Sequence, residues 1–309
     1  MQTSAFEYLR HGQTPFFRLP SVTWPAEPVD AIVLGVPHDG GTTYQPGARF
    51  APYHVRRTSA LVQSYHPVHR IDVFARLEAV DAGNVVFPPF DRAAMRAAVG
   101  EMIGDAYAMR ATPFVIGGDH SVTAPILRAA ATAHGPLAVL HIDAHLDTSG
   151  PETWGDDHHH GTPLRHAIGE GSIAPGALAS IGIRGSWGAP DESDLVRRHD
   201  ALIATPDDVV AHGIPRLVAQ LRERFAGKPL YITVDVDGLD PAFAPGTGTP
   251  VPGGLSTREV LAILRGLAGL HVVGMDVVEI SPALDHADLT CHLGAHLLYE
   301  GLALRAVRG

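Results

Sequence analysis

Short apolar runs alternate with longer amphipathic stretches along most of this 309-residue chain. A short apolar run is typical of a buried β-strand, whereas apolar residues at a spacing of three to four indicate a helix. The runs predict strands at residues 31–36, 114–116, 137–142, 180–183, 230–236 and 272–277, with weaker candidates near 78–80 and 201–204. The longer stretches predict helices at residues 52–64, 92–110, 122–133, 215–225, 257–267 and 286–305. Strands that alternate with helices in this way are typical of βαβ units and a mainly parallel sheet.

Two of the predicted strands have the pattern of central strands. Residues 137–140 and 231–234 form continuous runs without charged residues, which is expected where helices cover both faces of a sheet. No linker divides the chain, because the Gly/Pro-rich stretches 148–161 and 241–254 directly follow acidic motifs and are better explained as loops around a site. We therefore predict an α/β protein with one three-layer α/β/α domain over residues 31–309, built on a mainly parallel sheet of about eight strands. Residues 1–30 would form an N-terminal extension.

Candidate metal ligands gather directly behind the predicted central strands. An extended chain sends residues i, i+2 and i+4 to the same face, and ligands of open α/β sheets bind outside the carboxyl ends of the strands. A histidine in a Gly-Gly-Asp-His run comes after another predicted strand. The candidate ligands are His120, Asp143, His145, Asp147, Asp235 and Asp237.

A structural explanation does not account for this set of carboxylates. A single aspartate at a strand end is commonly an N-cap or a turn residue, and we assign Asp119 to that role. Several carboxylates a few ångströms apart repel one another strongly, and burial costs each of them several kcal/mol unless a countercharge is present. Neither motif contains lysine or arginine. Divalent cations are the remaining partners.

The ligand types indicate two hard to borderline ions. There are more candidate ligands than the four of a closed zinc site, no thiolate is among them, and aspartate oxygen dominates with some imidazole, which fits Mn²⁺. Two ions about 3.5–4 Å apart would share bridging carboxylates and a water. Even a single zinc ion lowers the pKa of bound water to about 7, so hydroxide should be available at neutral pH.

Composition and charge narrow the class of partner. The chain is 45% hydrophobic and 18% charged, as in soluble globular proteins, and its net charge of −10 argues against nucleic acid or an anionic membrane. The single cysteine, Cys291, excludes an internal disulfide and is expected to be a packed, inert thiol. The N-terminus has no apolar signal region, and no stretch is long enough for a membrane helix. We therefore expect a cytoplasmic protein.

The motifs resemble those of the ureohydrolase family, which comprises arginase, agmatinase and enzymes that hydrolyse guanidino acids. Residues 117–121 (Gly-Gly-Asp-His-Ser), 143–147 (Asp-Ala-His-Leu-Asp) and 233–241 (Thr-Val-Asp-Val-Asp-Gly-Leu-Asp-Pro) look like the three metal motifs of that family, in order. Residues 244–250 and 253–255 continue the match. The resemblance extends from about residue 31 to the C-terminus. It implies an arginase-like fold and a hydrolase that releases urea from a small guanidino substrate.

The resemblance also implies a division of the ligands between two Mn²⁺ ions. One ion would be held by His120, Asp143, Asp147 and Asp235. The other would be held by Asp143, His145, Asp235 and Asp237, so that Asp143 and Asp235 bridge. Because the family's members are commonly trimers or hexamers, we expect a homotrimer or homohexamer.

Two further residues match catalytic positions of the family. His160, in the run His-Gly-Thr-Pro, resembles the active-site histidine that shuttles protons, whereas we interpret His158 and His159 as exposed turn residues. Glu279 resembles the carboxylate that binds the guanidinium group of the substrate. His160 would also contact the substrate. After hydroxide attack, Asp147 would relay a proton to the leaving nitrogen.

By the family resemblance, the loop 148–161 is expected to recognise the tail of the substrate, which is the part beyond the guanidinium group. This loop carries Glu152, Asp156 and Asp157 and lacks the Asn/Ser-rich run with which arginase binds the α-carboxylate, so arginine is disfavoured. An acidic mouth suits the ammonium group of agmatine, and Asp157 is the candidate contact, although these acids could also simply face solvent.

Three alternatives stay open. A guanidino acid such as 4-guanidinobutyrate or 3-guanidinopropionate needs a cation near its carboxylate, and Arg165 or Arg184 could supply it. A single-zinc deacetylase shares the family's fold, but the presence of both His120 and Asp147 favours a second ion. A non-catalytic partner subunit would normally have lost ligands, and this chain has kept them all.

Overall fold

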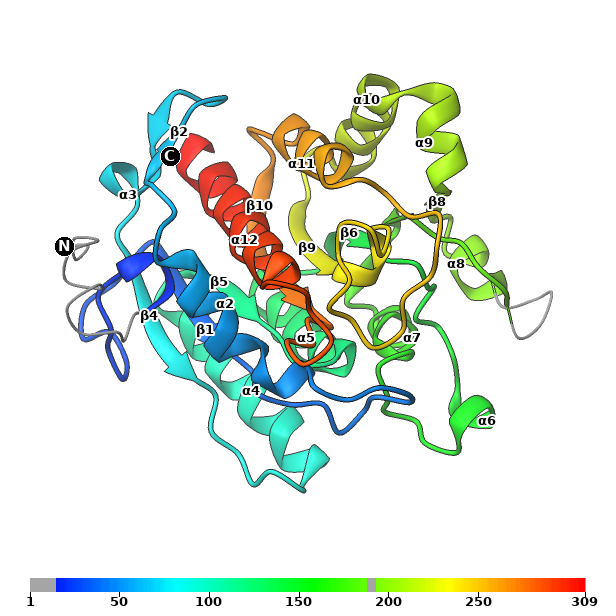
Figure 1. Ribbon diagram of the computed structural model, residues 1–309, viewed down its shortest axis with the longest axis horizontal. Coiled ribbons are helices and arrows are strands. Elements are labelled where there is room, and N and C mark those ends of the chain that lie inside the picture. The colour runs from blue at the N-terminus through cyan, green and yellow to red at the C-terminus, as the bar shows by residue number, and fades with distance from the viewer. Residues whose placement is uncertain (1–14, 188–192, 309) are drawn as a thin grey trace.

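The computed structural model describes residues 15–187 and 193–308. Its centre is a parallel sheet in the order β4-β1-β5-β10-β9-β6-β7-β8 (Figure 1). Its eight strands are β1 (Ala31–Gly35), β4 (Ala79–Asn84), β5 (Thr112–Ile116), β6 (Leu137–Ile142), β7 (Ile173–Ile181), β8 (Leu202–Ala204), β9 (Pro229–Asp235) and β10 (His271–Val278). The prediction of a mainly parallel sheet of about eight strands is confirmed.

Strand β6 shows why the continuous apolar runs become central strands. All its residues are buried, and alternate side chains enter different hydrophobic cores. Ala138 and Leu140 face one core, whereas Leu137 and Val139 face the other. A strand with two buried faces has to be apolar on both, because each face loses its contact with water.

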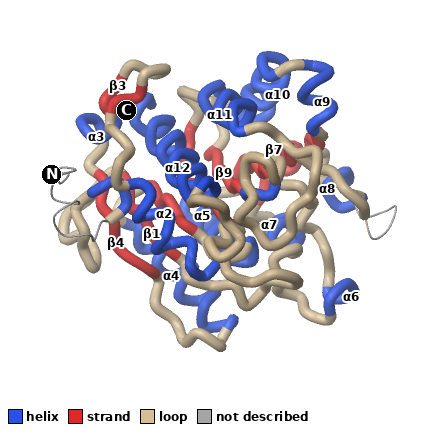
Figure 2. Tube along the Cα trace, in the orientation of Figure 1, coloured by secondary structure: helices blue, strands red, loops and turns tan. Residues whose placement is uncertain are grey.

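Helices cover both faces of the sheet. One face packs against α2 (Ala51–Ser59), α10 (Ile214–Phe225), α11 (Thr257–Gly266) and α12 (Leu289–Arg308). The other face packs against α4 (Arg92–Ala108), α5 (Thr123–His134) and α7 (Pro163–Gly169). The remaining short helices are α3 (Val73–Arg76), α6 (Pro151–Trp154), α8 (Asp194–Arg198) and α9 (Pro206–His212). Figure 2 shows the strands enclosed between these helices, which is the predicted three-layer arrangement.

Several boundaries differ from those expected, each for a local reason. Strand β7 begins earlier than predicted, and its register against β6 shifts around Pro175, which has no N–H to donate, and Gly176, which has a positive φ. Helix α12 begins later than predicted, because Ala287 and Asp288 adopt positive φ angles and the Asp285 carboxylate accepts the first free N–H groups of the helix. A small antiparallel hairpin, β2 (Tyr65–His66) and β3 (Ile71–Asp72), has no counterpart in the prediction.

Part of the expected N-terminal extension packs into the core. Residues 1–14 lie outside the described part, but Phe16 and Phe17 are completely buried, and the ring of Phe17 stacks on Tyr299 of α12 at 5.1 Å. None of the helices in the described ranges has the length and apolar character needed to span a membrane.

Candidate metal centre and active site

Four neighbouring strands deliver the predicted site residues to one edge of the sheet. In the order β5-β10-β9-β6, the segments at the carboxyl ends of these strands carry the residues of the site. A 3₁₀ helix, η3 (His120–Val122), follows β5 and presents His120, while η4 (Val236–Gly238) follows β9 and presents Asp237. The strand order, which the sequence does not specify, therefore brings together motifs that are far apart in the chain.

The first group of ligands surrounds the ring of His120. Its Nδ1 lies 2.8 Å from Asp147 Oδ2, 3.0 Å from Asp143 Oδ2 and 3.4 Å from Asp235 Oδ2. The four side chains are almost completely buried. Three carboxylates therefore converge on one ring nitrogen.

The other nitrogen of His120 fixes which atom carries the proton. Its Nε2 lies 2.9 Å from Thr233 Oγ1, and that hydroxyl donates its own hydrogen to Asp276 at 2.6 Å. Thr233 must then accept from Nε2–H, so in the neutral ring the lone pair is on Nδ1 and faces the three carboxylates. His120 Nδ1 and Asp147 Oδ2 are buried and have no hydrogen-bond partner in the described part of the chain. A proton or a metal ion at Nδ1 is needed to balance these carboxylates, and the residues fit a metal ion.

The second group lies on the other side of Asp143. His145 Nδ1 is 3.1 Å from Asp237 Oδ2 and 3.4 Å from Asp143 Oδ1, so the two oxygens of Asp143 face different groups, as a bridging ligand would. Asp235 Oδ2 lies 3.4 Å from His120 in the first group, and Asp235 Oδ1 accepts the backbone N–H of Asp237 at 2.8 Å, but its bridging role stays a prediction. Burial, together with the charges of Asp237 and Asp143, raises the pKa of Asp235 well above its ordinary value, which is the expected effect of like charges without a cation.

A buried histidine that the sequence analysis missed supports the bridging aspartate. His141 Nε2 lies 2.8 Å from Asp143 Oδ2, and its Nδ1 lies 3.1 Å from Ser180 Oγ. His141 is two residues before Asp143 on β6, so the period-two rule that selected the ligands would also have selected this residue. It orients a ligand from behind.

His160 and Glu279 meet beside the first ligand group. His160 Nδ1 lies 3.0 Å from Glu279 Oε1, and the same oxygen accepts the backbone N–H of His120 at 2.8 Å. Burial alone would lower the pKa of His160, but the charge of Glu279 outweighs it and raises the pKa to about 9. The other ring nitrogen of His160 contacts Thr43, a residue that the sequence analysis did not consider.

Asp147 and Glu279 share an unusual backbone conformation. Their φ angles are +54° and +62°, in the left-handed region that costs a non-glycine residue about 1–3 kcal/mol. Both lie in loops that follow a sheet strand, and both carboxylates contact His120, Asp147 at the ring and Glu279 at the backbone N–H. Such strain is commonly found at functional sites.

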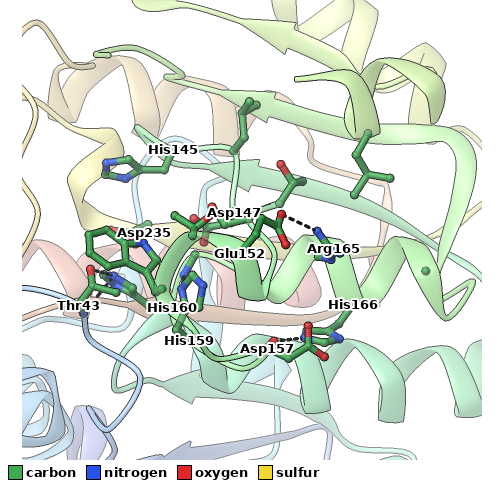
Figure 3. Close-up of a pocket in the computed structure, with 18 of the residues that line it drawn as sticks. Thr43, His145, Asp147, Glu152, Asp157, His159, His160, Arg165, His166 and Asp235 are labelled. Atoms are coloured by element: carbon green, nitrogen blue, oxygen red, sulfur yellow. Dashed lines mark hydrogen bonds and ion pairs between the residues drawn. The ribbon is translucent and has the colours of Figure 1, made fainter. Parts of the chain in front are cut away.

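A cavity of about 1250 Å³ opens onto this cluster (Figure 3). Its wall includes Asp235 and Asp147 of the candidate metal centre, His160, and the loop residue Asp157, whose side chain is 54% exposed. Arg165 of α7 also lines the cavity and pairs with Glu152 at 3.5 Å. The candidate contacts for the substrate tail therefore share one cavity with the metal ligands.

Two interpretations from the sequence are wrong. His159, expected as an exposed turn residue, is only 3% exposed, because its Nδ1 accepts the N–H of Gly161 inside the turn. Arg184, considered as a carboxylate binder, donates instead to backbone carbonyl groups, among them Asp237 at 2.7 Å and Gly238 at 3.1 Å. It holds the loop that carries a metal ligand and has no capacity left for a substrate.

The assignments of Asp119 and Cys291 agree with the structure, whereas that of His158 agrees only in part. Asp119 caps η3 by accepting the N–H of Ser121. His158 is half-buried rather than fully exposed, and its ring stacks on His166. Cys291 is completely buried, and burial raises the pKa of its thiol, which is consistent with an inert residue.

Comparisons with known proteins identify the family. A model described as "Arginase family" matches residues 29–303. The chain belongs to the arginase family. Its enzymes are hydrolases of guanidino carbon–nitrogen bonds and depend on a pair of metal ions. This assignment confirms the expected reaction class and favours it over the single-zinc deacetylase.

Several arginase-family relatives match nearly the whole chain. Proclavaminate amidinohydrolase of Streptomyces clavuligerus is 45% identical in an alignment of 297 positions that covers 94% of each chain. Its solved structure superposes with a TM-score of 0.92 at 42% identity, covering 97% of this chain and 99% of that one. Guanidinopropionase of Pseudomonas aeruginosa is 39% identical (96% of this chain, 92% of the relative), and mitochondrial agmatinase of Gallus gallus is 38% identical (95% and 86%). The relatives differ in substrate, so family membership leaves the substrate tail open.

Proposed function

We propose that this arginase-family enzyme hydrolyses agmatine to putrescine and urea. Agmatine carries an ammonium group at the end of its tail, and the pairing of the acidic residues in the loop 148–161 supports this substrate. Asp156 pairs with Arg92 of α4 and Glu152 with Arg165, whereas the half-exposed Asp157 lies in the cavity wall with its carboxylate 4.0 Å from His166. Asp157 is thus the acid of this loop best placed to attract an ammonium group.

We propose Mn²⁺ as the metal, because the ligand atoms are carboxylate oxygens and imidazole nitrogens without sulfur. One ion would be held by the group around His120, and the other by Asp143, His145 and Asp237 with Asp235. When bound, the two ions would supply Lewis-acid activation of a water molecule at neutral pH.

The protein's own residues would orient the substrate and move protons. Glu279 Oε2 makes no hydrogen bond in the described part of the chain, so it is available to the planar guanidinium. Asp147, with a buried oxygen that has no hydrogen-bond partner among the described residues, would pass a proton to the departing nitrogen. His160 would then exchange protons with the solvent of the cavity.

We also propose that the protein forms a homotrimer or homohexamer, which sedimentation analysis would test.

Urea release from agmatine, 4-guanidinobutyrate, 3-guanidinopropionate and arginine tests the substrate. The Mn²⁺-loaded enzyme should have its highest kcat/KM with agmatine and its lowest with arginine. A strong preference for arginine would show that the loop 148–161 has been misinterpreted. No urea from any of the four compounds would overturn the proposed reaction.

A guanidino acid is the second candidate, and Arg165 favours it. This side chain is 41% exposed in the cavity, and its partner Glu152 is 70% exposed. Exposed pairs of this kind contribute little energy, so a substrate carboxylate could replace Glu152 at low cost.

Two substitutions should separate the candidates. For an ammonium tail, Asp157→Asn should raise KM for agmatine about tenfold and leave KM for 4-guanidinobutyrate nearly unchanged, since a charge-assisted contact contributes about 1.5 kcal/mol or more. For a carboxylate tail, Arg165→Met should raise KM for 4-guanidinobutyrate by a similar factor. Steady-state kinetics of both variants with both substrates distinguishes the two candidate substrates. If KM is unchanged for both substrates, neither Asp157 nor Arg165 binds the tail of the substrate.

A further inference from the structure

Both ring nitrogens of His160 are occupied, although the residue is expected to exchange protons. Nδ1 lies 3.0 Å from the Glu279 carboxylate. Nε2 lies 2.7 Å from Thr43 Oγ1, and the backbone N–H of Thr43 also points at it from 3.3 Å (Figure 3). A proton that leaves or enters the ring therefore has to pass one of these two partners.

The two partners differ in what they can do for a titrating histidine. A carboxylate only accepts hydrogen bonds, whereas a hydroxyl both donates and accepts. When Nε2 is unprotonated, the N–H and O–H of Thr43 can both donate to its lone pair. When Nε2 is protonated, the Thr43 oxygen can accept from it. Thr43 can satisfy Nε2 in both states without moving the ring.

We propose that Thr43 is a positioning residue that holds His160 for proton exchange and relays protons between Nε2 and cavity water. In the relay, the Nε2–H proton moves to Thr43 Oγ1 while the hydroxyl proton moves to a water molecule. The ring is then neutral, the hydroxyl is regenerated and the water carries the proton. The inference rests on the proposed role of His160.

The surroundings of Thr43 support a fixed position. The backbone N–H of His160 donates to the Gly41 carbonyl at 3.0 Å, so the loop that carries Thr43 is tied to the loop that carries His160. Gly41 N–H donates in turn to Asp119 Oδ2 at 2.7 Å, and Asp119 caps the 3₁₀ helix that begins at His120. The hydroxyl is thereby held in register with the metal ligands.

The exposure of Thr43 fits the outer end of the relay. The residue is half-buried and lines the same cavity as His160, so solvent in the cavity can reach it. Glu279 is only 2% exposed, which makes the other ring nitrogen a poor route to solvent.

The test is Thr43→Val, which keeps the shape of the side chain and removes the hydroxyl. With the better of agmatine and 4-guanidinobutyrate as substrate, kcat should fall about tenfold, as expected for a lost hydrogen bond to a charged group, while KM stays within about twofold. Thr43→Ser, which keeps the hydroxyl, should restore most of kcat. Thr42→Val is the matched control, because the Thr42 hydroxyl has no hydrogen-bond partner in the described part of the chain.

A double-mutant cycle separates the relay from a merely structural role. In a His160→Asn background, Thr43→Val should cause no further loss of kcat, because the two residues act as one unit. Equal losses in both backgrounds, or wild-type kcat in Thr43→Val, would overturn the inference about Thr43. Wild-type kcat in His160→Asn would instead remove the proposed role of His160. Absence of urea release by the wild type would refute the proposed function itself.

Discussion

Asp143→Asn should reduce the metal content below two ions per chain and lower kcat/KM by about 10³-fold or more. The two oxygens of Asp143 face different ligand groups, with Oδ2 near His120 and Oδ1 near His145. Asparagine keeps the shape but offers one neutral oxygen to two cations. A loss of several kcal/mol of charge stabilisation corresponds to a rate loss of this size. Elemental analysis and urea release measure the two effects.

Thermal unfolding gives an independent measure of the same loss. Ions that bind only the folded chain stabilise it, so a chelator should lower the Tm of the wild type by several degrees and that of Asp143→Asn by much less. Asp240→Asn is the matched control. The Asp240 carboxylate accepts backbone N–H groups of Ala242 and Gly253 near the same motif and contacts none of the ligands. A variant at Asp143 with two ions and normal turnover would refute the assignment of the centre.

The candidate metal ligands could be selected from the sequence because their constraints are local. The spacing of Asp143, His145 and Asp147 and the apolar run before them locate the end of a strand. The extended backbone expected there is not found, because β6 ends at Ile142 and Asp147 has a φ of +54°. The same rule applied one step further back would have found His141, whose side chain contacts Asp143 from β6. The spacing in the sequence therefore contains the signal for His141.

Residues that depend on contacts between loops could not be predicted in this way. Thr43 and His160 are 117 positions apart, and only the strand order brings their loops together. Arg184 looked like a free cation, because nothing local shows that carbonyl groups of the loop around Asp237 surround its guanidinium. His159 looked exposed for the same reason. The spacing of residues along the chain predicts on which face of a strand or helix a side chain lies. It does not predict which other segments of the chain cover that face.

Glu279→Gln should abolish most activity while leaving the metal content intact. Glutamine keeps an oxygen that can accept the N–H of His120 and the Nδ1–H of His160, so the surrounding structure should persist. It removes the negative charge that would fix the guanidinium, and an oriented charge in a buried site is worth about 3–4 kcal/mol, or about 10²–10³ in rate. Urea release and elemental analysis, measured on the same preparation, test the prediction.

The same substitution should change the titration of His160 in a known direction. The charge of Glu279 raises the pKa of His160 to about 9 against the opposing effect of burial. Without that charge, the pKa of His160 should fall from about 9, because burial lowers it and only the charges of Asp119 and Asp147 still raise it. NMR titration of the ring should show this shift in Glu279→Gln but not in Glu170→Gln, which changes a carboxylate of the cavity wall that pairs with Arg128. Unchanged turnover in Glu279→Gln would remove Glu279 from the mechanism, and an unchanged pKa would mean that its charge does not control His160.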